Sequence, residues 1–308
     1  MTDSSAISEL AFTYQDREYY FLSKRDYIGE KIRATGEFYS IDELEFLLSI
    51  GIPPGRIVDC GAHIGNHTVF FAQVMERTVL AFEPTIDSFK LLTENVAANN
   101  CDGRVELINM ALGQTPGEAL MVVTPENTGA AFVEGCRAID KDAPVEFRQV
   151  ELTSLDSVVG EEPVSLLKID VEGSELEVLR GAQKTIRRHT PVIVVECQDS
   201  RSKGDVTACL AGLGYDCGAV IGISDSLVFT HRHKHRGLAI SATAFLTRKI
   251  DRHWSSRSQL PPAYESMLLD EVQRLRAVNS AANKQIEAIR KSKALPAFLH
   301  QTLRRFLT

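Results

Sequence analysis

Short apolar runs alternate with amphipathic segments of helical length through the middle of the chain, and this alternation limits the possible fold more than any other feature. The apolar runs end in turn or polar residues and read "RIVDCG", "TVLAFEP", "VELINMALG", "SLLKID" and "PVIVVEC". Segments with helical periodicity, such as "IDSFKLLTENVAANN" and "SELEVLRGAQKTIRRH", separate them. Strands that alternate with helices form crossover units, so we expect an α/β fold with a mostly parallel sheet and helices on both faces.

The chain divides into three predicted segments. We expect an N-terminal hairpin and helix in residues 1–50, the alternating α/β domain in residues 51–260, and a helical tail in residues 263–308. In the first segment, Ser40 followed by Glu43 predicts a capping box for the helix "SIDELEFLLSIG".

The alternation lapses between Gly113 and Leu155, which predicts extra strands or loops over the ligand-binding edge of the sheet. Small residues in "NTGAAFV", within this region, suit a loop that closes over a ligand, and a plain β-turn is the alternative.

The composition is that of a globular protein without a basic surplus. The 308 residues carry a net charge of −7, which does not favour nucleic-acid binding. None of the six cysteines forms a CxxC pair, so a zinc ribbon or thioredoxin-like site is not expected. The N-terminus lacks the pattern of a signal peptide, and no run approaches the roughly 20 apolar residues that span a bilayer. We therefore expect a cytoplasmic protein with reduced thiols and no transmembrane segment.

Polar side chains follow five predicted strands at the points where these strands end. Ligands of open parallel sheets bind beyond the carboxyl ends of the strands, which meet at one edge. The residues are Asp59, Glu83, Asn109, Asp170 and Glu196. These side chains therefore predict one binding site at that edge.

The segment "DCGAHIG" after the first of these strands limits the kind of ligand. Gly61 allows a sharp turn, and Gly65 allows a close approach to the backbone. His63, however, stands where the dinucleotide fingerprint G-x-G-x-x-G has its second glycine, and the third glycine is absent. The pattern therefore disfavours a pyrophosphate.

Glu83 points to a nucleoside. A carboxylate at the end of the second strand can accept hydrogen bonds from both hydroxyls of a ribose. S-adenosylmethionine fits a site for a nucleoside without a pyrophosphate, with its adenine near Asn109 and its ammonium group near Asp59 and Asp170.

Several motifs in order along the chain carry a family resemblance. "VDCGAHIGNHTVFFA", "AFEPTIDSFKLLTENVAANN", "NMALG", "NTGAAFV" and "SLLKIDVEGSELEVLRGA" resemble the FkbM-type S-adenosylmethionine-dependent methyltransferases over roughly residues 54–200. The resemblance implies the Rossmann-like class I methyltransferase fold with a seven-stranded sheet, and methyl transfer to a hydroxyl, often of a sugar, a glycan or a natural product. With the strand-end pattern, it assigns cofactor binding to Asp59, Gly61, Ala62, Gly65, Glu83, Asn109 and Asp170. The chain departs from the family's frequent Asn at His63 and at Thr85.

A sugar hydroxyl has a high pKa, so its methylation benefits from a general base. Glu172, in the loop after the strand "SLLKID", is our first choice, and Glu196, His63 and His67 are the other candidates. The alternative for Glu172 is a carboxylate that only stabilises the following helix N-terminus. Asp170, Glu172 and Glu196 also have the oxygen ligands that Mg²⁺ takes, although we do not favour a metal.

The end of the chain has its own pattern. Apolar residues at alternating spacings of 4 and 3 in residues 264–290, with Asn279 at an a position, predict a coiled coil that joins copies of the chain or a partner enzyme. A helix docked on the chain's own domain is the alternative. The basic run of residues 231–236 is expected to be a solvated loop, and contact with an anionic substrate or a membrane headgroup is the alternative. For the basic segment at the C-terminal end of the chain, a peripheral membrane role is a further possibility.

Two other functions stay open from the sequence. The first is a nicotinamide-dependent oxidoreductase, which His63 and the missing third glycine disfavour. The second is a catalytically silent cofactor-binding scaffold that acts through its C-terminal helix.

Overall fold

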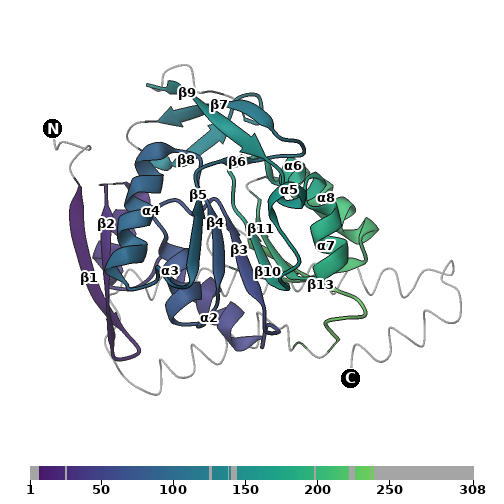
Figure 1. Cartoon of the computed structure of the whole chain (residues 1–308), viewed down its shortest axis with the longest axis horizontal. Helices are drawn as coiled ribbons and strands as arrows, with labels where there is room; N and C mark the ends of the chain where they lie inside the picture. The colour runs from purple at the N-terminus through teal and green to yellow at the C-terminus, as the bar shows by residue number, and fades with distance from the viewer. Residues whose placement is uncertain are drawn as a thin grey trace, which may run out of the picture. The chain divides into compact units, whose positions relative to one another are not determined.

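The computed structural model describes residues 7–238, apart from residues 25, 125–126, 138, 140–143, 198, 222–225 and 237 (Figure 1). These residues lie in the first of two compact units, which spans residues 1–240. The predicted coiled coil at residues 264–290 and the rest of the helical tail lie outside the described residues. The division into three segments stays a prediction.

A seven-stranded sheet forms the centre of the fold. Its strands are β3 (Arg56–Cys60), β4 (Val79–Phe82), β5 (Val105–Ile108), β10 (Val164–Ile169), β11 (Val192–Glu196), β12 (Tyr215–Ile221) and β13 (Ser226–His231). The order is β12-β13-β11-β10-β3-β4-β5, and only the β13 pairings are antiparallel. All residues of β4 and β10 are buried, as in strands covered on both faces. The predicted mostly parallel sheet is thus confirmed.

Helices connect these strands. They are α3 (Asn66–Gln73), α4 (Ile86–Ala98), α5 (Leu155–Val158), α6 (Glu175–Arg180), α7 (Gln183–His189) and α8 (Ser200–Gly212). The segment predicted as one helix from residue 174 to 189 is two helices, α6 and α7, which meet at Gly181 and Ala182. A Cβ on Gly181 would lie 2.0 Å from the carbonyl oxygen of Gly113, so the break occurs where another chain segment comes close to the backbone. Among the described residues, no helix is both long enough and apolar enough to cross a bilayer.

An N-terminal hairpin packs beside α4. Its strands β1 (Ser8–Tyr14) and β2 (Arg17–Ser23) pair antiparallel, and helices α1 (Tyr27–Thr35) and α2 (Ile41–Ser49) follow. Alternate aromatic side chains of the hairpin contact Phe38 edge-on. Asn95 of α4 and Asn99, the C-cap residue of this helix, bond the edge of β2 that faces α4: Asn95 accepts from the N–H of Leu22 and donates to its carbonyl, and Asn99 does the same with Tyr20.

The capping box predicted for α2 is wrong. Ser40 has a left-handed backbone (φ 55°) and its side chain makes no capping hydrogen bond. Glu43 is only 4 % exposed, and it accepts a 2.6 Å hydrogen bond from Ser226 Oγ in the central sheet. The acid that looks like a cap from the sequence is therefore a buried group that joins α2 to β13.

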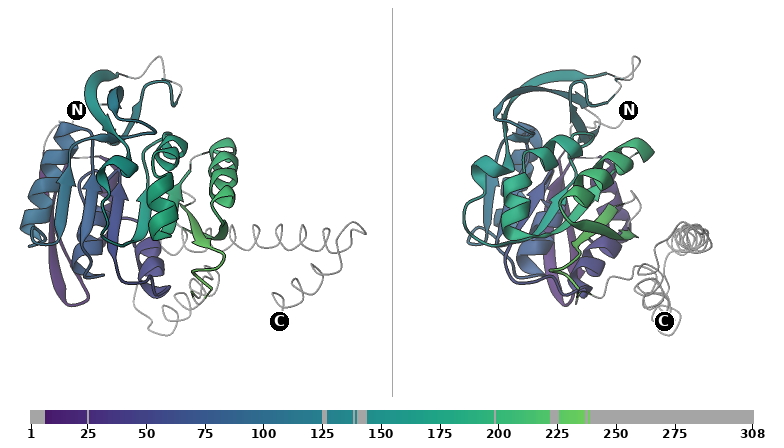
Figure 2. Two further views of the ribbon diagram at one scale, coloured as in Figure 1. Left: turned by 45° about the vertical axis from the view of Figure 1, so that its right-hand side comes forward. Right: turned by 90° about the vertical axis from the view of Figure 1, so that its right-hand side faces the viewer.

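The region between β5 and β10 forms a second sheet. Its strands are β6 (Ala111–Leu112), β7 (Gly117–Thr124), β8 (Asn127–Val133) and β9 (Glu146–Thr153), in the order β6-β9-β7-β8. The segment "NTGAAFV" is therefore neither a loop nor a β-turn, but the edge strand β8. Figures 1 and 2 show this insert above one edge of the seven-stranded sheet. α1 contacts β8 from the side of the hairpin.

Candidate active site

The parallel register brings the carboxyl ends of the central strands together. Lys168 of β10 lies opposite Asp59 of β3, and the chain turns at Gly61 just after these paired positions. Gly61 has φ +84°, and a Cβ there would lie 1.8 Å from the carbonyl oxygen of Asp170. Because no side chain fits that space, Gly61 allows the ends of β3 and β10 to meet.

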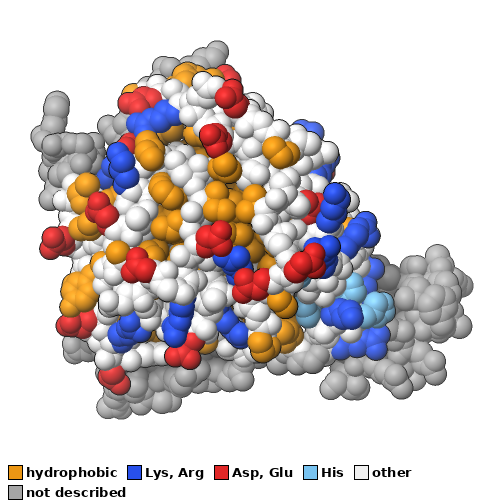
Figure 3. All heavy atoms as spheres, in the orientation of Figure 1, with side chains coloured by type: hydrophobic (Ala, Val, Ile, Leu, Met, Phe, Trp, Pro, Cys, Tyr) orange, Lys and Arg blue, Asp and Glu red, His pale blue; other side chains and the backbone are white. Residues whose placement is uncertain are grey.

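A cavity of about 320 Å³ opens between these strand ends and the insert. This volume is that of a small-molecule site. Tyr27, Ile28 and Tyr39 of the N-terminal segment, Gly129–Ala131 of β8 and the strand ends line it. Figure 3 shows hydrophobic side chains gathered on this face below the insert, with acidic side chains beside them.

Six of the residues predicted from the sequence line this cavity. They are Gly61, His63, Glu83, Asp170, Glu172 and Glu196. They come from four strand ends and their loops, so the structure brings together the ends that we expected to meet. Asp59, Ala62, Gly65 and Asn109 are not among the lining residues.

Three of those four residues support the lining of the cavity through hydrogen bonds or close packing without lining it themselves. Asn109 donates to the carbonyl oxygens of Glu83 (2.7 Å) and Pro84 (3.0 Å), and its neighbour Met110 lines the cavity instead. A Cβ on Gly65 would lie 2.7 Å from Leu92 Cδ1, so this glycine lets α4 approach the loop. Ala62 is 6 % exposed and its N–H donates to the carbonyl oxygen of Phe82.

Glu83 is held in a fixed orientation just after β4 by three hydrogen bonds. Its Oε2 accepts from the N–H of His63 at 2.9 Å, and its Oε1 accepts from the N–H of Thr85 at 2.8 Å and from Thr85 Oγ1 at 2.5 Å. Burial raises the pKa of Glu83, while His63 and the Thr85 hydrogen bonds oppose the rise. The carboxylate is thus preorganised to accept further hydrogen bonds from a ligand.

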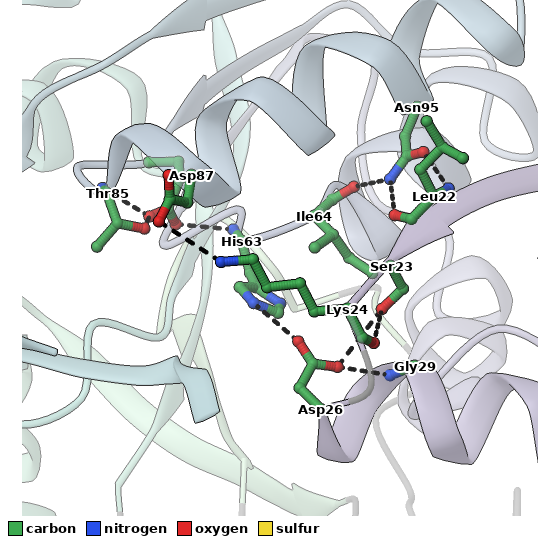
Figure 4. A network of polar contacts seen from close by, with 11 residues as sticks. Leu22, Ser23, Lys24, Asp26, Gly29, His63, Ile64, Thr85, Asp87 and Asn95 are labelled. Atoms are coloured by element: carbon green, nitrogen blue, oxygen red, sulfur yellow. Dashed lines mark hydrogen bonds and ion pairs between the residues drawn. The ribbon is translucent and has the colours of Figure 1, made fainter. Parts of the chain in front are cut away.

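His63 connects this carboxylate to the N-terminal segment. The residue has φ 50°, and its Nε2 lies 3.6 Å from Asp26 Oδ2. Asp26 is the N-cap of α1, and its other carboxylate oxygen accepts from the N–H of Gly29. Figure 4 shows this contact between α1 and the loop after β3. No sequence motif points to Asp26.

Asp59 belongs to a buried charge cluster beneath the cavity. Its side chain accepts from Thr68 Oγ1 at 2.7 Å and lies 3.6 Å from the Nζ of Lys168, which also pairs with Asp170 at 3.1 Å. Burial lowers the pKa of Lys168, but the surrounding carboxylates outweigh this and raise it above its ordinary value. Sequence reasoning missed Lys168, although a lysine inside the apolar run "SLLKID" was a signal for a buried charge that needs partners.

Glu172 follows β10 in a left-handed conformation (φ 58°). Its Oε2 accepts a 2.6 Å hydrogen bond from Arg137 Nη1, which extends from the insert. Glu196 ends β11 and lines the same cavity. The described residues hold no group of three or more His, Cys, Asp or Glu side chains arranged for a metal ion. His67, the other candidate base, is 9 % exposed, and burial lowers its pKa well below 6.5.

A mostly parallel sheet of this order, with a cavity and a fixed carboxylate at its strand ends, defines a Rossmann-like α/β protein. Residues 59–217, just over half of the chain, match the family model described as "Methyltransferase FkbM domain", so the chain belongs to this family of methyltransferases. The resemblance seen in the sequence motifs is confirmed.

Curated relatives share this domain. "Methyltransferase 1" of Beauveria bassiana is 30% identical over 48% of this chain, and the match covers 66% of that protein, slightly less than two thirds. "Hexuronic acid methyltransferase AglP" of Haloferax volcanii is 28% identical, with 55% and 67% covered. "31-O-demethyl-FK506 methyltransferase FkbM" of Streptomyces tacrolimicus is 29% identical, with 54% and 75% covered. Among solved structures, "Methyltransferase FkbM" from Methylobacillus flagellatus aligns with a TM-score of 0.42 and 19% identity, over 57% of this chain and 43% of that one.

Proposed function

We propose that this protein is an S-adenosylmethionine-dependent O-methyltransferase that methylates a hydroxyl of a small acceptor such as a sugar, a glycan unit or a natural product. The observation that carries the proposal is the fixed carboxylate of Glu83, which lines one cavity together with Glu172. Two relatives, a hexuronic acid methyltransferase and a 31-O-demethyl-FK506 methyltransferase, support a small acceptor that is methylated on oxygen.

The donor set fits the cofactor. Glu83 offers carboxylate oxygens to the two ribose hydroxyls, and the apolar side chains of Phe82, Met110 and Leu112 flank it for an adenine. The N–H of His63, which a pyrophosphate would need, is already donated to Glu83. This arrangement favours a nucleoside over a dinucleotide and so disfavours the nicotinamide-dependent oxidoreductase.

S-adenosylmethionine, when bound, supplies a sulfonium methyl group whose transfer forms a carbon–oxygen bond, leaves the electron pair of the broken carbon–sulfur bond on sulfur, and releases the hydroxyl proton. We assign the acceptance of that proton to Glu172, because it lines the cavity in the loop after β10. Gly61 keeps the strand ends close, and Asp170 is fixed by Lys168. Alignment of the reacting groups is the main contribution of the protein. Glu196 and His63 are the second choices as base.

Thermal shift with S-adenosylmethionine, S-adenosylhomocysteine and NAD tests the cofactor: we expect stabilisation by the two sulfur nucleosides only. Stabilisation by NAD alone would favour the oxidoreductase. The base is tested with Glu172→Gln, and the exposed Glu177→Gln is the matched control. The first variant should lose methyl transfer to a panel of hydroxylated acceptors and keep the cofactor affinity by calorimetry. Lost cofactor affinity would contradict the base assignment, and cofactor binding without any turnover in the unmodified protein would favour the silent scaffold.

A further inference from the structure

Arg137 reaches the cavity from the insert and is held in place on three sides. Its Cζ lies 5.2 Å from the centroid of the Phe132 ring, a cation–π distance. A Cβ on Gly173 would lie 3.0 Å from Arg137 Cγ, and Gly173 has φ +113°, so the loop after β10 has the shape that admits the arginine side chain. Its Nη1 donates to Glu172 at 2.6 Å. A guanidinium fixed in this way loses little rotamer entropy when it binds a ligand.

Among the described residues, Glu172 is the hydrogen-bond partner of the Arg137 guanidinium. A guanidinium carries five N–H donors in a planar fork. Toward the described residues, Arg137 uses one of them, at Nη1, and the side chain is 35 % exposed where it lines the cavity. The remaining donors match the geometry of a carboxylate, which binds arginine through two parallel hydrogen bonds.

Arg137 is also the one Lys or Arg side chain among the described residues that line the cavity. The carboxylates around it already have partners: Glu83 accepts from His63 and Thr85, and Asp170 pairs with Lys168. An anionic group on an acceptor would therefore find its favourable contact at Arg137. The carboxylate of the acceptor and the carboxylate of Glu172 would then bind the same guanidinium. A hydroxyl close to the acceptor's carboxylate would therefore lie beside Glu172.

We propose that Arg137 determines acceptor specificity, and that the acceptor is a hydroxy acid whose carboxylate binds Arg137 while the neighbouring hydroxyl faces Glu172. The inference rests on the proposed O-methyl transfer and adds to it the class of substrate. It also assigns a role to the insert, which delivers the acceptor-recognising cation to the loop after β10.

The test measures binding of D-glucuronate, D-gluconate, D-glucose and glucose 6-phosphate to the full chain saturated with S-adenosylhomocysteine. We expect at least one of the two sugar acids to bind at least tenfold more tightly than glucose. Arg137→Gln should lower this affinity at least tenfold, and Arg137→Lys should restore part of it. Arg148→Gln is the matched control, because Arg148 is on the same insert, is 31 % exposed and pairs with Asp87 and Glu146 away from the cavity. This control should keep the preference for the acids.

Equal binding of the acids and glucose, no binding of either acid, or an unchanged preference in Arg137→Gln would overturn the inference. Tighter binding of glucose 6-phosphate than of either acid would show that a phosphate, not a carboxylate, is recognised, and would also overturn it. The binding of S-adenosylhomocysteine is measured first. Its absence would contradict the proposed function itself, whereas its presence without an acid preference would contradict only the role of Arg137.

Discussion

Replacement of Glu43 by glutamine should make the protein more stable in a manner that depends on pH. Glu43 is 4 % exposed, accepts one hydrogen bond from Ser226, and lies 3.9 Å from Nε2 of His67. Burial raises the pKa of its carboxyl from 4.5 to about 7, although Ser226 and Lys168 oppose the rise. Glutamine keeps nearly the same shape and the ability to hydrogen-bond, but it has no charge to bury.

The size and sign of the effect follow from the two pKa values. Between pH 4.5 and 7 the folded protein holds a proton at Glu43 that the unfolded chain has released, so the free energy of unfolding decreases as the pH rises through this window. The full shift corresponds to about 3 kcal/mol at about 1.36 kcal/mol per pKa unit. Most of this change, about 2–3 kcal/mol, falls between pH 5 and pH 8. Glu43→Gln should therefore gain about that much stability, relative to the unmodified protein, over the same range.

Urea unfolding at pH 5, 6, 7 and 8 measures this difference, and Glu94→Gln, an exposed glutamate of α4, is the control that should show no pH-dependent change. The neighbouring His67 titrates in the opposite sense, because its lowered pKa costs stability as the pH falls below 6.5. That contribution is present in both proteins and cancels in their difference. A difference between Glu43→Gln and the unmodified protein that stays constant from pH 5 to pH 8 would refute the reasoning.

Three further substitutions test the site. Gly61→Ala should prevent folding, as judged by circular dichroism, because the new Cβ would overlap the backbone after β10, whereas Gly103→Ala, which has open space around it, should fold normally. Lys168→Met should lower the free energy of unfolding by about 3–5 kcal/mol, because Asp59 is left buried without its counter-charge, and a second change of Asp59 to Asn should recover part of the loss in urea unfolding. Glu83→Gln should weaken S-adenosylhomocysteine binding by roughly tenfold or more in calorimetry, since hydrogen bonds to a charged acceptor contribute about 1.5–3 kcal/mol; an unchanged affinity would remove Glu83 from the cofactor site.

The pattern of apolar residues along the chain predicted the buried strands of the central sheet. The runs that became β3, β4, β10 and β11 are apolar because both of their faces are covered, and this property is visible residue by residue. The gathering of Glu83, Asp170, Glu172 and Glu196 at one edge then follows from parallel pairing alone. The lapse of alternation after β5 likewise predicted an insert of extra strands or loops, but it left open which of the two "NTGAAFV" forms.

The errors and omissions share one physical cause, which is that the partner of a side chain can lie far away in the sequence. Glu43 has the spacing of a cap, but its hydrogen-bond partner is Ser226, 183 residues later. Arg137 has no local pattern at all, and its hydrogen-bond partner Glu172 lies 35 residues later. Asp59 was predicted from its place at a strand end, and its partner Lys168 lies more than 100 residues later in the sequence. No periodicity along the chain encodes such pairs.

Asn95 of α4 and its C-cap residue Asn99 bond the edge of β2 at the place that a third strand would take. Positions four apart on a helix rise by about 6 Å, and positions two apart on a strand rise by about 6.6 Å, so Asn95 and Asn99 can match two successive rungs of β2 and would fall out of step over a longer run. Those side-chain amides occupy the outward N–H and carbonyl groups of Tyr20 and Leu22. An open strand edge is a template for pairing between chains and for aggregation. The edge of β2 is thus covered at Tyr20 and Leu22, and the loss of either asparagine would expose the backbone groups of one of these residues to pairing with other molecules.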